Sequence, residues 1–274
     1  MPIHYQTRGH IADIIIDGDG PMNPVTPEMM KELYEAFLRF REDRTVRVAI
    51  LTGAGDTAFC AGGNTKRHWA TRETFFSPEA LVARFWHPSE HANVAGEPWI
   101  WNMCMMEQFK PVIAAVRGFC LGGGLINMLA MSDIRIVSED AQFGLSEIRL
   151  GHGAGVFALT RLHHQLNYAM AMELILTGDR MSAQDALRLG LVNRVVPKER
   201  VQAVAEEYAQ RVAANSPSAV RASKEVFLRA MDEPSRANLS RLTDAIGVLQ
   251  RQGKDMLEGH KAWEEKRKPV FTDD

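Results

Sequence analysis

Short runs of apolar, often β-branched residues alternate along the chain with longer stretches in which apolar residues recur every three or four positions. Residues 11–17, 46–52 and 110–116 are such short runs, and they predict buried β-strands. Thr26 and Pro27 mark the start of a predicted helix between the first two strands. The apolar face of this helix consists of Met30, Leu33, Phe37 and Phe40. The start of the chain therefore predicts a β-α-β unit, as in layered α/β folds.

The third strand leads into three consecutive glycines, Gly122, Gly123 and Gly124, and an apolar segment at residues 125–131 predicts a buried helix after them. The N-terminus of a helix carries backbone N–H groups without intrahelical partners and favours negative charge nearby. The run has neither the G-x-G-x-x-G spacing nor the Gly-Lys-Ser/Thr of a phosphate loop, which disfavours those nucleotide sites. Taken alone, the glycines fit a ligand-binding turn or a tightly packed structural turn.

The C-terminal part of the chain has the pattern of amphipathic helices. Three are expected, at residues 199–214, 217–231 and 235–264. Polar breaks that contain Pro217 and Pro234 separate them. We therefore expect a core domain over residues 1–198 and a helical region over residues 199–274.

Composition and charge exclude several classes of protein. With 46% hydrophobic residues, a chain of 274 residues can bury a sizeable core. The formal charge of −2 gives no drive toward nucleic acid or anionic membranes. No apolar run reaches the length of a membrane span, and the N-terminus lacks the pattern of a secretory leader. We therefore expect a soluble cytoplasmic protein with no nucleic-acid or membrane partner.

Cysteine and histidine spacing gives no support for a metal site. The three cysteines have no C-x-x-C spacing, which disfavours a disulfide framework and a zinc site and suits a reducing compartment. His87 and His91 are four residues apart, but Pro88 lies between them and no carboxylate pattern accompanies them. We expect no metal ion.

Four stretches carry a more specific signal when taken together. They are residues 58–64 (AFCAGGN), 111–124, 141–148 (AQFGLSEI) and 176–186 (LTGDRMSAQDA). In this order they resemble the signatures of the crotonase superfamily, the enoyl-CoA hydratases and isomerases, and the resemblance covers nearly the whole chain. It implies an α/β crotonase fold, with a repeated ββα spiral core and a C-terminal helical trimerisation region. It also implies an acyl-CoA substrate and a homotrimer, or a hexamer built as a dimer of trimers.

The resemblance assigns roles to three residues. The backbone N–H groups of Gly63 and Gly123 are expected to form an oxyanion hole for the thioester carbonyl. Two fixed amide donors suit an enolate oxygen because they stabilise its charge without moving a proton. Glu147 is expected to move the proton. A lone glutamate is often a surface or ion-paired carboxylate, but the position of Glu147 in a matching motif favours catalysis.

Further positions are expected to bind the substrate. Ala61 stands close before the first oxyanion glycine, and Lys66 matches a lysine that lies near the CoA phosphates in several family members. Lys266 is expected to reach the phosphates of a CoA bound to a neighbouring subunit. Solvated surface lysines are the alternative interpretation of both. His152 and Phe157 are candidates for the surroundings of the acyl group, with a structural histidine as the alternative for His152.

One departure from the family pattern bears on the reaction. Hydratases of this family use a second glutamate just inside the helix after the glycines, and the matching position here is Ile126, followed by Asn127. The spacing to Asp133 is one residue longer than usual, so Asn127 could occupy the space assigned to Ile126. Asparagine can hold a water or a substrate oxygen but cannot act as a base. A single-glutamate reaction is therefore expected.

Residues 67–109 are rich in aromatic residues and methionine. This composition suits either a pocket for a bulky apolar acyl group or packing against the body or a neighbouring subunit. The sequence leaves both interpretations open.

These observations predict an acyl-CoA enzyme of the enoyl-CoA hydratase/isomerase type, with no cofactor beyond the coenzyme A of the substrate. A crotonase-type lyase or C–C hydrolase is one alternative, because it would use the same enolate. A catalytically silent homologue that serves as a binding or assembly partner is the other.

Overall fold

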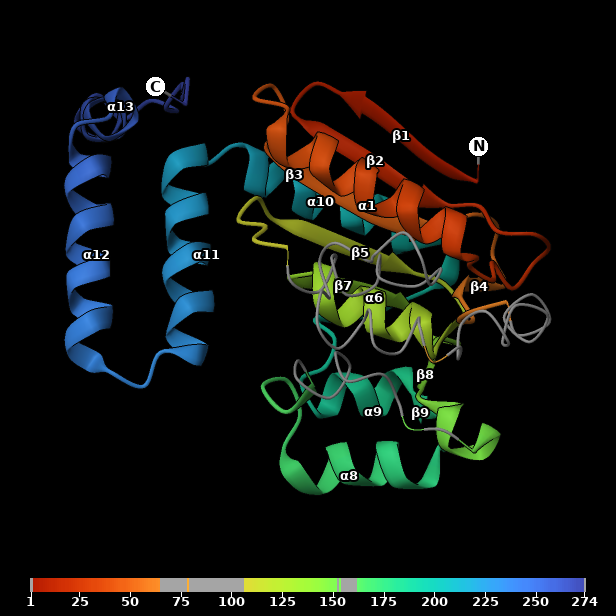
Figure 1. Cartoon of the computed structure of the whole chain (residues 1–274). Helices are drawn as coiled ribbons and strands as arrows, with labels where there is room; N and C mark the ends of the chain where they lie inside the picture. The colour runs from red at the N-terminus through yellow and green to blue at the C-terminus, as the bar shows by residue number, and fades with distance from the viewer. Residues whose placement is uncertain (1, 65–77, 79–105, 152, 154–161, 274) are drawn as a thin grey trace.

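The computed structural model of the chain describes residues 2–64, 78, 106–151, 153 and 162–273. Figure 1 shows a body of strands and helices with a helical arm beside it. Within these ranges, no helix is long and apolar enough to cross a membrane. Lys66, His152, Phe157 and nearly all of the aromatic-rich segment lie outside the described residues.

Six strands form the larger sheet, in the order β1-β2-β3-β5-β7-β10. They are β1 (Ile3–Arg8), β2 (Ile11–Ile16), β3 (Val48–Gly53), β5 (Val112–Val116), β7 (Ile134–Ser138) and β10 (Arg194–Val196). β1 pairs antiparallel with β2, and the other pairings are parallel. Every residue of β3 and β5 is buried, as expected of central strands covered on both faces. The three strands predicted from the sequence are confirmed as β2, β3 and β5.

Four shorter strands form a second sheet, in the order β4-β6-β8-β9. They are β4 (Ala58–Cys60), β6 (Phe119–Leu121), β8 (Gln142–Gly144) and β9 (Met181–Ser182). β4, β6 and β8 run parallel, and each follows a strand of the larger sheet in the chain. The chain therefore adds a strand to the larger sheet and then one to the smaller sheet, three times in succession.

Helices cover both faces of the larger sheet (Figure 1). On one face lie α1 (Pro27–Glu42) and α6 (Gly123–Met131), both of which contribute buried residues to the larger hydrophobic core. The predicted cap of α1 is confirmed, because Thr26 Oγ1 accepts a hydrogen bond from Met29 N–H at 3.3 Å. On the other face lies α10 (Val201–Ala213), which packs Val201 and Ala205 against the sheet in a second core.

Two helices and a 3-10 turn follow the strands of the smaller sheet in the chain. They are η2 (Ser146–Leu150), α8 (Tyr168–Thr177) and α9 (Ala183–Arg188). α8 ends at Gly178, which caps it in the left-handed conformation. α9 begins with a side-chain cap, in which Asp185 N–H donates to Ser182 Oγ at 3.1 Å.

The helical arm consists of α11 (Pro217–Asp232), α12 (Arg236–Arg251) and α13 (Lys254–Glu264). Figure 1 shows α11 and α12 side by side and antiparallel, apart from the sheets. The prediction of one helix over residues 235–264 is wrong, because the chain leaves the helix after α12 and Gly253 caps α13 with extended backbone (φ −75°, ψ 144°). α10 lies on the sheet, so the helices that stand apart begin at α11. The domain division after residue 198 stays a prediction.

Candidate active site

Two glycine loops lie side by side at the ends of β4 and β6. These strands are parallel neighbours, with Cys60 in register with Cys120. A Cβ added to Gly123 would lie 3.7 Å from the backbone N of Gly63, and one added to Gly62 would lie 3.3 Å from the N of Gly123. The pairing of β4 with β6 therefore brings together the two amides that the sequence assigns to the oxyanion hole.

The N–H groups of Gly63 and Gly123 both point away from the backbone hydrogen bonds of their own elements. Gly63 forms a parallel bridge with Val25, in which Val25 N–H donates to Gly62 O (2.9 Å) and Asn64 N–H donates to Val25 O (2.8 Å). In such a bridge the N–H of Gly63 points to the side opposite Val25. Gly123 is the first residue of α6, where a backbone N–H has no intrahelical acceptor and the helix dipole is positive. The arrangement can stabilise a negatively charged oxygen.

Each glycine of the triplet meets a different requirement. Gly122 has φ +51°, a conformation that residues with a side chain rarely adopt, and its N–H donates to Gly144 O at 2.8 Å. Gly123 leaves its N–H approachable because it has no side chain. Gly124 packs against β4 so closely that a Cβ would lie 2.1 Å from Cys60 O. The three glycines therefore allow close packing against β4 and leave the Gly123 N–H accessible to a ligand.

Glu147 reaches this site from η2. Its Oε1 lies 3.0 Å from the position that a Cβ would take on Gly122, and its Oε2 is buried. Arg149 fixes the same turn, since its Nε donates to Thr177 O at 3.2 Å and its guanidinium pairs with Asp179. The structure thus brings together Gly63, Gly123 and Glu147, the three residues predicted to be catalytic.

The positions after the glycines carry no carboxylate. Ile126 is buried in the larger core. Asn127 is fully buried, and its Nδ2 contacts Met30 Sδ of α1 at 3.5 Å. Among the described residues, Asn127 Oδ1 has no hydrogen-bond partner. Neither residue can supply the second acid or base of a two-glutamate hydratase.

The other predicted binding residues are placed differently. Ala61 is half-buried beside Gly62, and its N–H donates to Met22 O at 2.9 Å. Lys266 is exposed just after α13, at φ +55°. The contacts of the described residues do not connect Lys266 with the glycine loops, so its predicted role depends on a neighbouring subunit.

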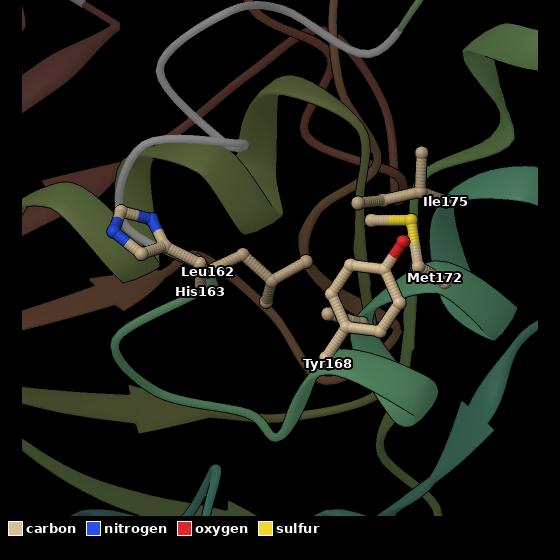
Figure 2. Close-up of a pocket in the computed structure, with 6 residues that line it drawn as sticks. Leu162, His163, Tyr168, Met172 and Ile175 are labelled. Carbon is tan, nitrogen blue, oxygen red and sulfur yellow. The ribbon is translucent and has the colours of Figure 1, made fainter.

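A pocket of about 350 Å³ adjoins α8. Its walls are Leu162, His163, Tyr168, Ala171, Met172 and Ile175. Figure 2 shows the Leu162 side chain directed toward Tyr168, with the His163 ring on the side away from it. These residues were not predicted from the sequence, although Tyr168, Met172 and Ile175 have the spacing of one helix face. The helix that forms this pocket also packs on η2, the turn that carries Glu147.

The chain is similar to known proteins over nearly its whole length. The family model described as Enoyl-CoA hydratase/isomerase matches residues 6–274. The chain is 35% identical over 274 residues to (E)-benzylidenesuccinyl-CoA hydratase of Thauera aromatica, with 99% of each chain covered. It is 36% identical over 274 residues to carnitinyl-CoA dehydratase of Proteus mirabilis, covering 98% of this chain and 97% of that one.

Solved structures show the same fold. An enoyl-CoA hydratase from Bacillus anthracis superimposes with a TM-score of 0.86 at 31% identity, covering 100% of both chains. An enoyl-CoA hydratase subunit from Geobacillus kaustophilus gives a TM-score of 0.86 at 30% identity, covering 100% of this chain and 99% of that one. The chain therefore belongs to the enoyl-CoA hydratase/isomerase family of the crotonase superfamily, which confirms the predicted fold and the predicted acyl-CoA enzyme type.

Proposed function

We propose that this enzyme moves a proton at the α-carbon of an unsaturated or β-hydroxy acyl-CoA. In this proposal the amides of Gly63 and Gly123 hold the thioester oxygen, and Glu147 takes and returns the proton. The observation that carries it is the position of the Glu147 carboxylate against Gly122, with Oε1 3.0 Å from the Cβ position of that glycine.

The chemistry follows from this arrangement. When the C–H bond at the α-carbon breaks, its electron pair moves into the enolate and negative charge develops on the thioester oxygen. Two amide donors and the N-terminus of α6 stabilise that charge where it forms. The proton goes to Glu147, whose Oε1 lies beside Gly122, the residue before the Gly123 donor. In this proposal the α-carbon, which is bonded to the thioester carbonyl, lies within reach of that carboxylate.

Reversible addition of water to an enoyl-CoA is the first candidate reaction. The names of the hydratase from Thauera aromatica and the dehydratase from Proteus mirabilis support it. As the water oxygen bonds to the β-carbon, Glu147 takes a proton from the water and the electron pair of the C=C bond moves into the enolate. Glu147 then returns this proton to the α-carbon.

Movement of the double bond is the second candidate. It is favoured by Ile126 and Asn127, neither of which can act as a base, at the two positions that the family resemblance offers for the first glutamate. One carboxylate that carries a proton between the α- and γ-carbons needs no second base. Lyase or C–C hydrolase chemistry would pass through the same enolate, and none of these reactions needs a cofactor beyond the CoA of the substrate.

Proton exchange in deuterated water tests the proposal directly. Saturated, 2-enoyl, 3-enoyl and aromatic acyl-CoAs are incubated with the wild type, with Glu147→Gln, and with Glu139→Gln as a control on an exposed glutamate. We expect deuterium at the α-position of at least one ester with the wild type and the control. The Glu147→Gln variant should be slower by about 100-fold or more.

The products and the binding data separate the alternatives. A hydrated product, a shifted double bond or a cleaved chain identifies hydratase, isomerase or lyase chemistry. Binding of CoA esters without exchange across the panel would point to the catalytically silent homologue. Absence of binding as well would contradict the acyl-CoA assignment.

We further propose that the enzyme assembles as a homotrimer, or as a hexamer of two trimers, through the helical arm. No residue of α12 is buried within one chain. Phe227, Leu249, Leu257 and Trp263 of the arm are 69%, 71%, 69% and 81% exposed. Exposed apolar residues gathered on one part of a molecule favour a surface that a partner covers. In such an assembly, Lys266 would be presented to the CoA of a neighbouring subunit.

Light scattering after size-exclusion chromatography tests this assembly. We expect the wild type and the control Arg44→Glu, on the exposed loop after α1, to have the mass of three or six chains. Leu257→Glu should shift the mass toward that of a single chain, because it places a charge in the buried contact. A wild type with the mass of one chain would contradict the assembly. The cytoplasmic location stays a prediction of the sequence.

A further inference from the structure

The loop that carries the Gly63 amide rests on a neighbouring segment, residues 22–25. Three backbone hydrogen bonds join the loop to this segment. They run from Ala61 N–H to Met22 O at 2.9 Å, from Val25 N–H to Gly62 O at 2.9 Å, and from Asn64 N–H to Val25 O at 2.8 Å. The bonds fall on both sides of Gly63, so the place of this amide depends on the place of residues 22–25.

Asn23 lies in the middle of this segment and fixes it to three other parts of the chain. Its Oδ1 accepts a hydrogen bond from Gly18 N–H at 3.2 Å. Its Nδ2 donates to Ala54 O and to Ala58 O, both at 2.8 Å. The residue is only 2% exposed, and its backbone has φ +46°, which asparagine tolerates better than most residues. A neutral side chain that offers two donors and an acceptor meets all three partners.

The backbone segments around Asn23 are closely packed. A Cβ on Gly18 would lie 2.6 Å from the backbone carbonyl carbon of Asn23, and a Cβ on Gly53 would lie 2.2 Å from Phe59 O. The end of β2, residues 22–25 and the strand β4 are therefore packed backbone against backbone. In this packing, the Asn23 side-chain amide connects the segment to Ala54, in the turn before β4, and to Ala58, the first residue of β4.

We propose that Asn23 is a positioning residue for the oxyanion hole. It holds the Gly63 amide at the distance from the Gly123 amide at which both can donate to one oxygen. The inference rests on the proposed function of those two amides. Asn23 acts through residues 22–25 and touches no substrate. A displacement of about 1 Å of one donor lowers the rate of a reaction by up to about 100-fold, because the donor no longer meets the charge where it develops.

Two variants separate this role from a merely structural one. Asn23→Gly keeps the left-handed backbone accessible and removes all three side-chain hydrogen bonds. Asn23→Asp keeps the acceptor for Gly18 and removes both donors. The control is Ser132→Ala, which deletes a buried hydroxyl that donates to Met128 O at 2.5 Å beyond the C-terminal end of α6. Circular dichroism and thermal unfolding establish how much of each protein is folded, and the kcat per folded enzyme of whichever Asn23 variant retains the fold decides the question.

For each variant, kcat for α-proton exchange is measured at saturating ester and expressed per folded enzyme, and KM is measured for the same ester. We expect kcat to fall about 10- to 100-fold in both Asn23 variants with KM changed by less than about twofold, because the lost stabilisation acts mainly in the transition state. Ser132→Ala should lower the unfolding temperature and leave kcat unchanged. Asn23 variants that unfold at lower temperature but retain wild-type kcat would overturn the inference. No exchange by the wild type on any ester would overturn the proposed function instead, and the role of Asn23 with it.

Discussion

Oε1 of Glu147 lies 3.0 Å from the position that a Cβ would take on Gly122. Gly122 also precedes the first residue of α6, whose N–H is one of the two proposed oxyanion donors. The same glycine therefore borders the proposed proton-transfer group on one side and a proposed oxyanion donor on the other. Any side chain at this position would disturb both.

Gly122→Ala should reduce kcat by about 100-fold or more, because the added methyl group meets the carboxylate and the left-handed backbone (φ +51°) resists it. Gly190→Ala is the matched control, since Gly190 has φ +80° and no atom within 4 Å of its Cβ position. Both variants should lose some stability, but only Gly122→Ala should lose activity. Equal kcat values for the two variants would contradict the placement of Glu147.

Arg149→Ala should lower kcat without a large change in stability. The guanidinium binds Thr177 O and Asp179 and so holds the turn that carries Glu147. This ion pair is exposed, so its loss should change the free energy of unfolding by less than about 1 kcal/mol. The rate should fall by about 3- to 10-fold, because Glu147 is less well held. Arg188→Ala breaks a comparable exposed pair with Asp185 and should leave kcat unchanged; a similar loss in both variants would contradict the prediction.

Cys60 and Cys120 should resist alkylation in the native enzyme. Burial raises the pKa of the Cys60 thiol to about 11 and raises the pKa of Cys120 well above its usual value. At about pH 8 only about one Cys60 thiol in a thousand is a thiolate, the form that reacts with iodoacetamide. Peptide mapping should find both residues unmodified in native protein and modified in urea. Rapid native labelling of Cys60 would show that β4 opens.

Lys110 should make stability depend on pH in the alkaline range. Its ammonium is buried and donates to Phe40 O (2.7 Å) and Asp43 O (2.5 Å). Burial lowers its pKa from 10.5 to about 8, with Arg221 adding to this effect and Asp43 and Asp273 opposing it. Between these two values the unfolded chain binds more protons than the folded protein, so raising the pH through this window stabilises the fold. Below about pH 8 both states are protonated and the term is constant.

Urea unfolding of the wild type and Lys110→Met at about pH 7 and about pH 10 measures this term. We expect the stability of the wild type relative to the variant to increase by about 1–2 kcal/mol at the higher pH. Comparing the two proteins at each pH cancels the titration of other groups. If the wild type and the variant differ in unfolding free energy by the same amount at both pH values, the lowered pKa of Lys110 is contradicted.

The elements that could be predicted from the sequence are those long enough to show a clear pattern of apolar and polar residues. The apolar runs of β2, β3 and β5 and the amphipathic face of α1 are of this kind. The strands β4, β6 and β8 have three residues each, too few to show a period, and they are stabilised by pairing with one another. The break between α12 and α13 depends on one extended glycine within a pattern that otherwise continues.

The candidate site likewise contains residues that local sequence motifs identify and residues that they do not. Gly63, Gly123 and Glu147 lie in local motifs, so their sequence context identified them as candidates. The contacts of Asn23 join residues that are distant in the chain, and a lone asparagine before a proline otherwise indicates only a turn. The pocket on α8 involves a helix face that sequence alone assigns equally well to the core.

The pairing of β4 with β6 has a consequence for how the enzyme gains activity as it folds. The two proposed donors stand just beyond Cys60 and Cys120, which are paired in register although they are far apart in sequence. Contacts of such long range form slowly, and a slip of one residue would carry one amide out of place. During refolding, helix content should therefore recover before turnover does. The time at which catalytic activity returns therefore reports when the smaller sheet reaches its native register.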